Sequence, residues 1–431
     1  MNRIREIKSE RAGDAYYEVR HSSGLKILIY PKPKNSSSYA IFGTKYGSID
    51  NCFRTSPGGE PQKVPNGIAH YLEHKLFESA EGDAFARFAK TGASANAYTS
   101  FDMTCFLFSC TANVYQSLEI LLDFVQSPYF TEQTVQKEQG IIGQEIRMYD
   151  DDPQWRVLFN LLGALYHTHP VKIDIAGTTD SIAKITPELL YRCYRTFYNL
   201  NNMVLCIAGN VEPDRVLQVC DKMLKPADPS YHVERIFEPE PEHIVKARAE
   251  QKMAVAVPLF ELGFKESCAA GRATTQQIAE TDILLEALAS DASPLFRRLL
   301  DAGLINEASF GHEYFEGPGF ASVIFSGESR DPEAAADEIK KAIASVRAEG
   351  FDRDTFERAK RAVYGRNIAA LNNVGCIANS LVALEFAGRE LFSYIDAVAQ
   401  ASVDDVLGRL EVQLRPQYSS LSVVRPKQPA P

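Results

Sequence analysis

A proline-rich, charged segment near the middle of the chain constrains the fold most. Residues 225–244 run KPADPSYHVERIFEPEPEHI, with four prolines among acidic and basic side chains. Prolines at that density prevent a continuous helix or a central strand, so the segment is typical of a connection between domains. The 431 residues are enough for two or three domains. We therefore expect one half at 1–225, an interdomain linker at 226–244 and a second half at 245–431.

The same order of elements is expected on both sides of the linker. Each half runs from a strand-like segment to a helix, a two-strand passage, a long helical passage, and a last helix that leads into a final strand. We interpret this as an internal duplication; the alternative is two unrelated α+β domains. Because the strands occur in runs, antiparallel sheets are favoured over a doubly wound parallel sheet. The predicted fold is α+β, with two homologous halves, each an antiparallel sheet with helices packed on one face.

Charge and hydropathy exclude several classes of protein. Acidic residues number 56 against 46 basic ones, a net charge of -10 that is the wrong sign for binding nucleic acid. No uninterrupted apolar run reaches the roughly 18 residues of a membrane span, so no membrane partner is expected. The N-terminal segment has no apolar core typical of a signal peptide. The eight scattered cysteines, without a CxxC pair, suit reduced, buried thiols in a cytoplasmic protein.

The strongest local signal is a His-x-x-Glu-His motif, formed by His70, Glu73 and His74 within a predicted helix. At about 100° per residue the two histidines lie about 40° apart, and Glu73 lies about 60° to the other side of His70. Both imidazoles can then bind one zinc ion while the carboxylate points at the open metal position, where a water needs a base. The spacing predicts a hydrolytic zinc site; the alternative is two surface histidines beside a solvated glutamate.

Such a site needs a third ligand, and residues 138–147 offer two glutamates. Glu138 and Glu145 are seven residues apart, so they fall on nearly the same face of a helix. One of them could complete a His/His/Glu set that leaves the fourth zinc position to water, while the other orients a ligating histidine. The spacing does not decide between them, and either glutamate alone is also consistent with a solvated helix position.

Together these motifs resemble the inverted-motif zinc peptidases of the pitrilysin and insulinase family, which includes mitochondrial processing peptidase and small bacterial peptidases. The resemblance covers nearly the whole chain and includes the segments GIAHYLEHKLFE, NAYTS, EQGIIGQEIRMYDDDP and HPVKIDIAGTTDSIAKIT. It implies a zinc metalloendopeptidase with one Zn²⁺ per chain. The implied roles are zinc ligation by His70, His74 and Glu145, general base catalysis by Glu73, and support of a ligand by Glu138.

The resemblance also implies a substrate-binding strand at Asn96, Ala97 and Tyr98. In the family the matching stretch lies on a sheet edge beside the zinc, where an extended peptide adds as a strand. Amides on a sheet edge bind any peptide main chain and leave the side chains to select within pockets. The alternative for residues 96–100 is a plain hairpin strand.

One departure from the family pattern concerns the second half. Many members carry an Arg and a Tyr there, in a pattern like LR-x-x-x-GLAY, whereas this chain has Leu300 and Asn306 at those positions. Pattern alignment of the halves places Arg366 near the counterpart of Glu145, and the second half has no HxxEH, so we expect no metal there. The hypothesis is that this chain is the zinc-bearing member of a dimer whose sister chain supplies the Arg/Tyr pair. The alternative is a non-catalytic scaffold or processing-complex subunit that keeps the fold.

Two further groups of residues have a functional and a structural interpretation. His167 and His169 could form a second metal site, but a His-x-His pair without a convergent acid is usually structural. His312 and Tyr314 could replace the missing Arg/Tyr donors, although ordinary strand positions are the favoured interpretation.

Overall fold

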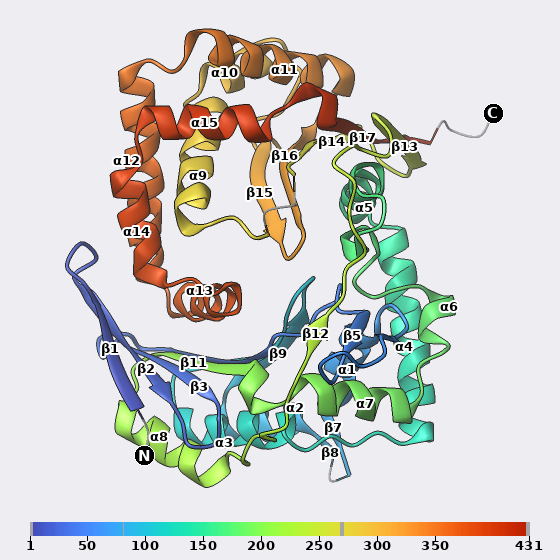
Figure 1. Ribbon diagram of the computed structural model, residues 1–431, viewed down its shortest axis with the longest axis vertical. Coiled ribbons are helices and arrows are strands. Elements are labelled where there is room, and N and C mark those ends of the chain that lie inside the picture. The colour runs from blue at the N-terminus through green and yellow to red at the C-terminus, as the bar shows by residue number, and fades with distance from the viewer. Residues whose placement is uncertain (1–2, 81, 268–270, 428–431) are drawn as a thin grey trace. The chain divides into compact units, whose positions relative to one another are not determined.

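The computed structural model describes residues 3–80, 82–267 and 271–427 (Figure 1). Contacts divide the chain into two compact units, and neither unit is one continuous stretch of sequence. Unit 1 takes the described residues of 1–146, 174–236 and 368–392, and unit 2 takes those of 147–173, 237–367 and 393–431.

Unit 1 is built on a seven-stranded sheet in the order β1-β2-β3-β11-β4-β10-β9. All neighbours are antiparallel except β3 and β11, which are parallel. Every residue of the central strand β11 is buried, whereas β9 forms one edge of the sheet. The strands span β1 Arg3–Ser9, β2 Asp14–Arg20, β3 Lys26–Pro31, β4 Ser38–Thr44, β9 Ser94–Thr99, β10 Thr104–Cys110 and β11 Met203–Gly209.

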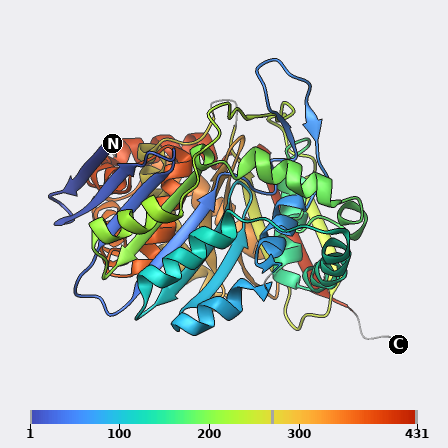
Figure 2. The same cartoon turned by 90° about the horizontal axis from the view of Figure 1, so that it is seen from below.

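Helices cover both faces of this sheet. Figure 1 shows α13 on one side of it and α2, α3 and α8 on the other, and Figure 2 shows the sheet from the side that the latter three cover. On the α13 side, Gly43 of β4 faces Val382 and Phe386. The helices of unit 1 are α1 Ile68–Leu76, α2 Ala84–Thr91, α3 Val114–Val125, the first part of α4 Glu132–Asp150, α6 Thr179–Ile182, α7 Pro187–Phe197, α8 Pro213–Met223 and α13 Val374–Ala387.

Two small sheets complete unit 1. One is three-stranded, in the order β12-β5-β6, and contains part of the expected linker in β12. The other pairs β7 with β8. Their bounds are β5 Cys52–Arg54, β6 Gln62–Lys63, β7 Glu78–Ser79, β8 Gly82–Asp83 and β12 Glu234–Arg235.

Unit 2 is built on a five-stranded sheet in the order β13-β17-β14-β16-β15. Leu262 and Phe264 of β14 point into a core shared with α9, whereas Gly263 between them faces Leu161 of α5. Because neighbouring strand residues point to opposite faces, α5 covers the face opposite α9. The elements are α5 Pro153–Leu165, β13 Arg248–Met253, β14 Leu259–Lys265, α9 Thr275–Ala289, α10 Pro294–Asp301, β15 Gly311–Gly317, β16 Phe320–Glu328, α11 Pro332–Glu349, α12 Arg353–Ala370, α14 Leu391–Gln400, α15 Val403–Gln413 and β17 Ser419–Pro426.

The predicted α+β fold with two homologous halves is confirmed. The strands β3-β11-β4-β10-β9 of unit 1 and β13-β17-β14-β16-β15 of unit 2 share one order and one set of directions. Two details go beyond the expectation. Each sheet has one parallel pair, because its last strand in sequence follows a helix that brings the chain back beside the first strand of the repeat. Each sheet also carries one helix from the other half of the sequence, so helices cover both of its faces and not one face as expected.

Because each sheet takes one helix from the other half of the sequence, the two compact units do not follow the sequence boundaries expected at 226–244. The segment 147–173, with α5, packs in unit 2, and the segment 368–392, with α13, packs in unit 1. Both helices carry apolar faces that need a sheet to cover them. Among the described residues, no single helix is long and apolar enough to cross a membrane.

The cysteines in the described residues are free thiols. Five of the seven are buried, as expected, whereas Cys52 is half-buried and Cys376 is exposed. Cys376 lies in the first turn of α13, where its backbone amide is capped by Asn373 and its side chain is exposed. Cys268 lies outside the described residues.

Candidate metal centre

The HxxEH motif lies on a short helix that is anchored at its start and along its length. Gly67 precedes α1 with φ 88°, and a Cβ there would lie 2.3 Å from the carbonyl oxygen of Ala176. Glycine therefore allows the close approach that places the first turn of α1. Further along, the hydroxyl of buried Tyr71 donates a hydrogen bond to the carbonyl of Val135 in α4. The two helices that carry the motif and the downstream glutamates are thus joined at a fixed point.

His70, His74 and Glu145 come together in unit 1. His70 Nε2 lies 3.6 Å from Glu145 Oε1, and His74 Nε2 lies 3.3 Å from Glu145 Oε2. One ligand atom from each residue lies within 4.8 Å of the others. Tetrahedral ligands at the usual zinc distance of about 2.0–2.1 Å lie roughly 3.4 Å apart. The donor set therefore fits zinc, with two imidazoles and one carboxylate.

Glu138 lies behind His74. Its Oε1 is 3.0 Å from His74 Nδ1, so that nitrogen donates to Glu138 and leaves Nε2 to face Glu145. Burial would lower the pKa of His74, but its hydrogen bonds to Glu138 and Glu145 outweigh this effect and raise the pKa to about 10. The site therefore attracts positive charge strongly. Of the two glutamates that the spacing left open, Glu145 faces both histidines and Glu138 supports one of them.

Glu73, the predicted base, faces a cavity next to this cluster. It is half-buried, and its Oε2 accepts a hydrogen bond of 2.7 Å from the hydroxyl of Thr99 at the end of β9. The cavity has a volume of about 480 Å³ and is also lined by His74, Glu138, Asn96 and Ala97. The predicted base and part of the predicted substrate strand therefore border one space.

The wall of the cavity is partly apolar. Phe77 and Phe85 stack with ring centres 4.3 Å apart, and Ile141 of α4 completes the lining on another side. Phe85 is 44% exposed and Ile141 is 47% exposed, which is high for large apolar side chains. The exposed apolar surface borders the cavity in which Asn96 and Ala97 lie.

The side chain of Tyr98 points to the face of the sheet opposite to that of Ala97 and does not line the cavity. Its hydroxyl donates to Asn379 Oδ1 of α13 at 3.0 Å, and Asn379 Nδ2 donates to the hydroxyl of Tyr39 at 3.1 Å. A helix from the second half of the sequence therefore holds the edge strand in place. The side chain of Tyr98 anchors β9, and Asn96 and Ala97 are the ones that line the cavity.

In unit 2 the helix that corresponds to α4 carries a cation. Arg366 of α12 pairs with Glu286 of α9 at 2.7 Å.

The residues at the missing donor positions have ordinary partners: Leu300 packs against the core, and Asn306 donates to Glu328 at 2.7 Å. Tyr314 packs against the same core and donates to Glu266 at 2.7 Å. Burial lowers the pKa of His312, which keeps its imidazole neutral within the strand.

His169 follows the structural interpretation. His169 Nε2 lies 2.9 Å from the carbonyl of Pro318, and its Nδ1 accepts from the amide of Val171 at 3.1 Å. Burial lowers the pKa of His169 to about 4, although the hydrogen bond to Pro318 opposes this shift. Both ring nitrogens of His169 are therefore engaged by the backbone, which leaves none for a metal.

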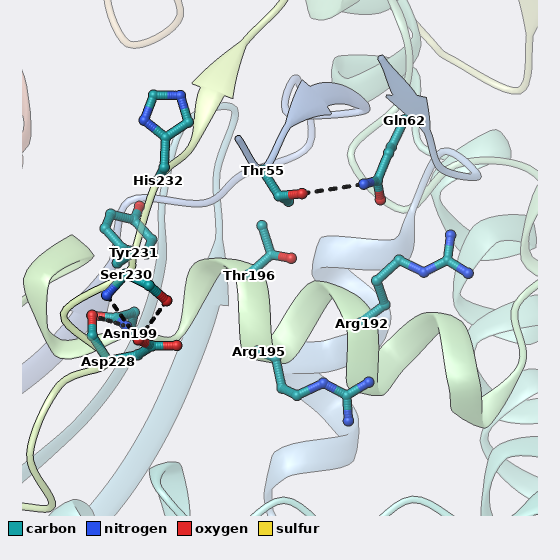
Figure 3. Close-up of a pocket in the computed structure, with 10 residues that line it drawn as sticks. All are labelled: Thr55, Gln62, Arg192, Arg195, Thr196, Asn199, Asp228, Ser230, Tyr231 and His232. Atoms are coloured by element: carbon teal, nitrogen blue, oxygen red, sulfur yellow. Dashed lines mark hydrogen bonds between the residues drawn. The ribbon is translucent and has the colours of Figure 1, made fainter. Parts of the chain in front are cut away.

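A cavity of about 520 Å³ lies elsewhere in unit 1, between α7, the β5–β6 hairpin and residues 228–232 (Figure 3). Arg192 and Arg195 of α7 line it, but their guanidinium groups point in different directions (Figure 3). Gln62 donates to Thr55 at 3.3 Å across its upper side. Among the described residues, the group of side chains that could hold a metal lies at the HxxEH motif, so the cavity beside that motif is the candidate catalytic site.

Sequence reasoning missed two neighbours of the motif. The first is Thr99, which contacts Glu73. The available sequence signal was strand alternation, which puts residues 97 and 99 on one face. The second is Lys75, which is fully buried and donates to Glu78. A lysine directly after a ligand histidine gives no sequence signal of burial, because lysine is almost always exposed.

Comparison with known proteins gives consistent matches over the chain. Residues 60–179 match the family model described as Insulinase (Peptidase family M16), and residues 184–363 match that described as Peptidase M16 inactive domain. The Uncharacterized zinc protease YmfH of Bacillus subtilis is 39% identical over 428 residues, covering 98% of this chain and 100% of that protein. A probable mitochondrial-processing peptidase subunit beta of Arabidopsis thaliana is 29% identical over 163 residues, 37% of this chain and 31% of that protein. The crystal structure of a putative M16-like peptidase from Alicyclobacillus acidocaldarius matches with a TM-score of 0.90 and 35% identity over 99% of both chains.

Proposed function

The chain belongs to the insulinase family of peptidases, family M16, and from that premise we propose that it is a zinc metalloendopeptidase acting on peptides or short unfolded segments. One observation carries the proposal: His70, His74 and Glu145 present donor atoms at the separations of a zinc site. Glu73 lies on the same helix as the two histidines and borders the adjoining cavity. Three protein ligands leave a position open, which is typical of catalytic rather than structural zinc.

Glu73 and Glu138 have different roles in the proposed hydrolysis. When bound, zinc supplies Lewis acidity that polarises the scissile carbonyl and lowers the pKa of water. Glu73 takes the proton of the attacking water and later delivers it to the leaving amine. Glu138 holds the Nδ1 proton of His74, so that Nε2 would be the nitrogen that binds the metal.

The substrate binds along β9 in this proposal. β9 is an edge strand, and the amide of Ala97 donates to the side chain of Asn96 at 2.8 Å, a contact that an incoming peptide carbonyl can replace. Beside it, Phe77, Phe85 and Ile141 give the cavity an apolar wall. We therefore expect main-chain recognition of the peptide, with a large apolar side chain held next to the scissile bond.

The chain acts in this proposal as the metal-bearing member of a dimer. Leu300 and Asn306 occupy the positions of the family's Arg and Tyr, so a sister chain would supply those donors. Support comes from the relative named as a subunit of a processing peptidase. The alternative function is a non-catalytic scaffold or processing-complex subunit, with which the absent Arg/Tyr pair is also consistent.

Hydrolysis of a quenched peptide library tests the proposal. The zinc-loaded chain is compared with Glu73→Gln and with Glu119→Gln, a matched change in an exposed ion pair with Lys222. Each is assayed with and without a candidate sister chain. Cleavage by the wild type and by Glu119→Gln, but not by Glu73→Gln, supports the peptidase, and dependence on the sister supports the dimer. Folded, zinc-loaded protein that is inactive in every combination favours the scaffold. The cytoplasmic location stays a prediction, which cell fractionation tests.

A further inference from the structure

A threonine on the edge strand is bonded directly to the candidate base. Thr99 is the last residue of β9, and its Oγ1 lies 2.7 Å from Glu73 Oε2. Glu73 comes from α1 and Thr99 from the sheet, so the contact links two elements that pack against each other. Both side chains are half-buried. Shielding from water makes a hydrogen bond to a carboxylate stronger than it is on an open surface.

The direction of this hydrogen bond follows from counting hydrogens. A carboxylate only accepts, so the single hydroxyl hydrogen of Thr99 goes to Glu73. Thr99 Oγ1 also lies 3.3 Å from Thr104 Oγ1, and the hydroxyl of Thr104 donates to the carbonyl of Tyr46 at 2.8 Å. Thr104 can therefore only accept from Thr99, and the carboxylate of Glu73 is the nearer and the charged one of the two acceptors within reach of the Thr99 hydrogen.

The threonine is held more firmly than the glutamate it contacts. Thr99 pairs with Thr104 in the register of β9 and β10, and Thr104 is fully buried. A β-branched side chain in a strand is stiff at χ1, whereas a glutamate has three rotatable bonds. The strand therefore orients the carboxylate, and not the reverse. With Oε2 held by Thr99, the carboxylate plane of Glu73 is set relative to the cavity that it lines.

We propose that Thr99 is a positioning residue for Glu73. The inference rests on the proposed peptidase function, in which Glu73 is the base. Because β9 is also the strand along which the substrate is proposed to bind, one element would place both the peptide and the base. The side-chain contacts of Thr99 are with Glu73 and Thr104 and not with the ligand residues, so its loss should impair turnover and leave zinc binding intact. Because this role depends on the hydroxyl group, a serine at position 99 should preserve it.

The test compares Thr99→Val, which keeps the shape, with Thr99→Ser, which keeps the hydroxyl. Purified full-length chains are assayed for kcat, KM, zinc content and melting temperature, with the sister chain present if the wild type needs it. For Thr99→Val we expect kcat to fall about 10- to 100-fold, part of the roughly 10²–10⁴ that a positioned acid or base supplies. KM and zinc content should stay within about twofold, and Thr99→Ser should recover most of kcat, because only the base is displaced.

Crystal structures of the two variants provide a readout independent of activity. Glu73 should keep one orientation in Thr99→Ser and lose it in Thr99→Val. Unchanged kcat and unchanged Glu73 in Thr99→Val would overturn the inference, as would equal losses in both variants. Should Thr99→Val fail to fold, Thr99→Ala replaces it in the same comparison. An inactive wild type overturns the proposed function instead, and the orientation of Glu73 in the variants then decides the positioning role alone.

Discussion

His74 Nε2 and Glu145 Oε2 lie 3.3 Å apart, although one belongs to α1 and the other to α4. The distance between them is that of two ligands of one zinc ion, and His70 approaches the same carboxylate from the preceding turn of α1. The site is therefore formed by the packing of two helices in unit 1. Binding of a metal there should stabilise the folded arrangement of those helices.

Zinc should raise the thermal stability of the chain. A ligand at 100 times its dissociation constant stabilises the native state by about 2.7 kcal/mol. Calorimetry of the zinc-loaded and chelator-treated wild type should therefore show a lower melting temperature without zinc. In Glu145→Gln this difference should largely disappear, whereas Glu132→Gln, an exposed change on the same helix, should keep it. An equal zinc effect in Glu145→Gln would contradict the assignment of that ligand.

Glu138 should tune zinc affinity without being a ligand. It accepts the Nδ1 proton of His74, and loss of such a partner typically costs about 10- to 100-fold in metal affinity. Glu138→Ala should show a loss of that size in a competition titration with a chelating dye. Glu138→Gln keeps an acceptor and should lose less. Wild-type affinity in Glu138→Ala would show that His74 does not depend on this contact.

Two glycine-to-alanine changes should act in opposite directions. In Gly43→Ala the new Cβ would lie 3.0 Å from Val382 Cγ1 of α13 and 3.0 Å from Cys105 Sγ, so we expect a loss of about 1–3 kcal/mol from overpacking. In Gly140→Ala the Cβ meets nothing within 4 Å, and a helix interior prefers alanine by about 0.5–1 kcal/mol. Urea unfolding measures both. A harmless Gly43→Ala would contradict the close packing of α13 on the sheet.

Glu240 should make stability depend on acid pH. Its carboxylate accepts from the backbone amides of residues 167–169 and from Lys265. Burial would raise its pKa, but these hydrogen bonds outweigh it and lower the pKa from 4.5 to about 2. A lowered folded-state pKa gives stability that is present above about pH 4.5 and is lost as the pH falls toward 2.

The check on Glu240 is the urea midpoint of the wild type and of Glu240→Gln at several pH values. Glu240→Gln should be less stable than the wild type at pH 7, and the difference between their urea midpoints should become smaller between pH 4.5 and 2. Glu242→Gln is the control, because Glu242 forms an exposed ion pair with Arg415 and such pairs contribute little. A difference in urea midpoint that stays constant over that pH range would contradict a stabilising role for the Glu240 carboxylate charge.

The sequence was most informative where a periodic pattern decides the geometry. Helical pitch placed His70 and His74 on one face, and the resemblance to the insulinase family is confirmed. Spacing could not choose between Glu138 and Glu145, because residues seven apart share a face and the choice depends on how α4 crosses α1. Nor could an apolar helical pattern show that α13 packs on the first sheet and α5 on the second. The contact of Thr99 with Glu73 was hidden for the same reason, since it depends on a helix packing against a strand.

The most direct test of the central claim measures zinc content and peptide hydrolysis together in the wild type and Glu73→Gln. The account predicts one zinc per chain in both proteins, because Glu73 is not a ligand. Hydrolysis should be lost on chelation of the wild type and be lower by about 10²–10⁴-fold in Glu73→Gln, as expected for removal of a general base. Equal hydrolysis by zinc-loaded wild type and Glu73→Gln, or activity that survives complete removal of zinc, would contradict it.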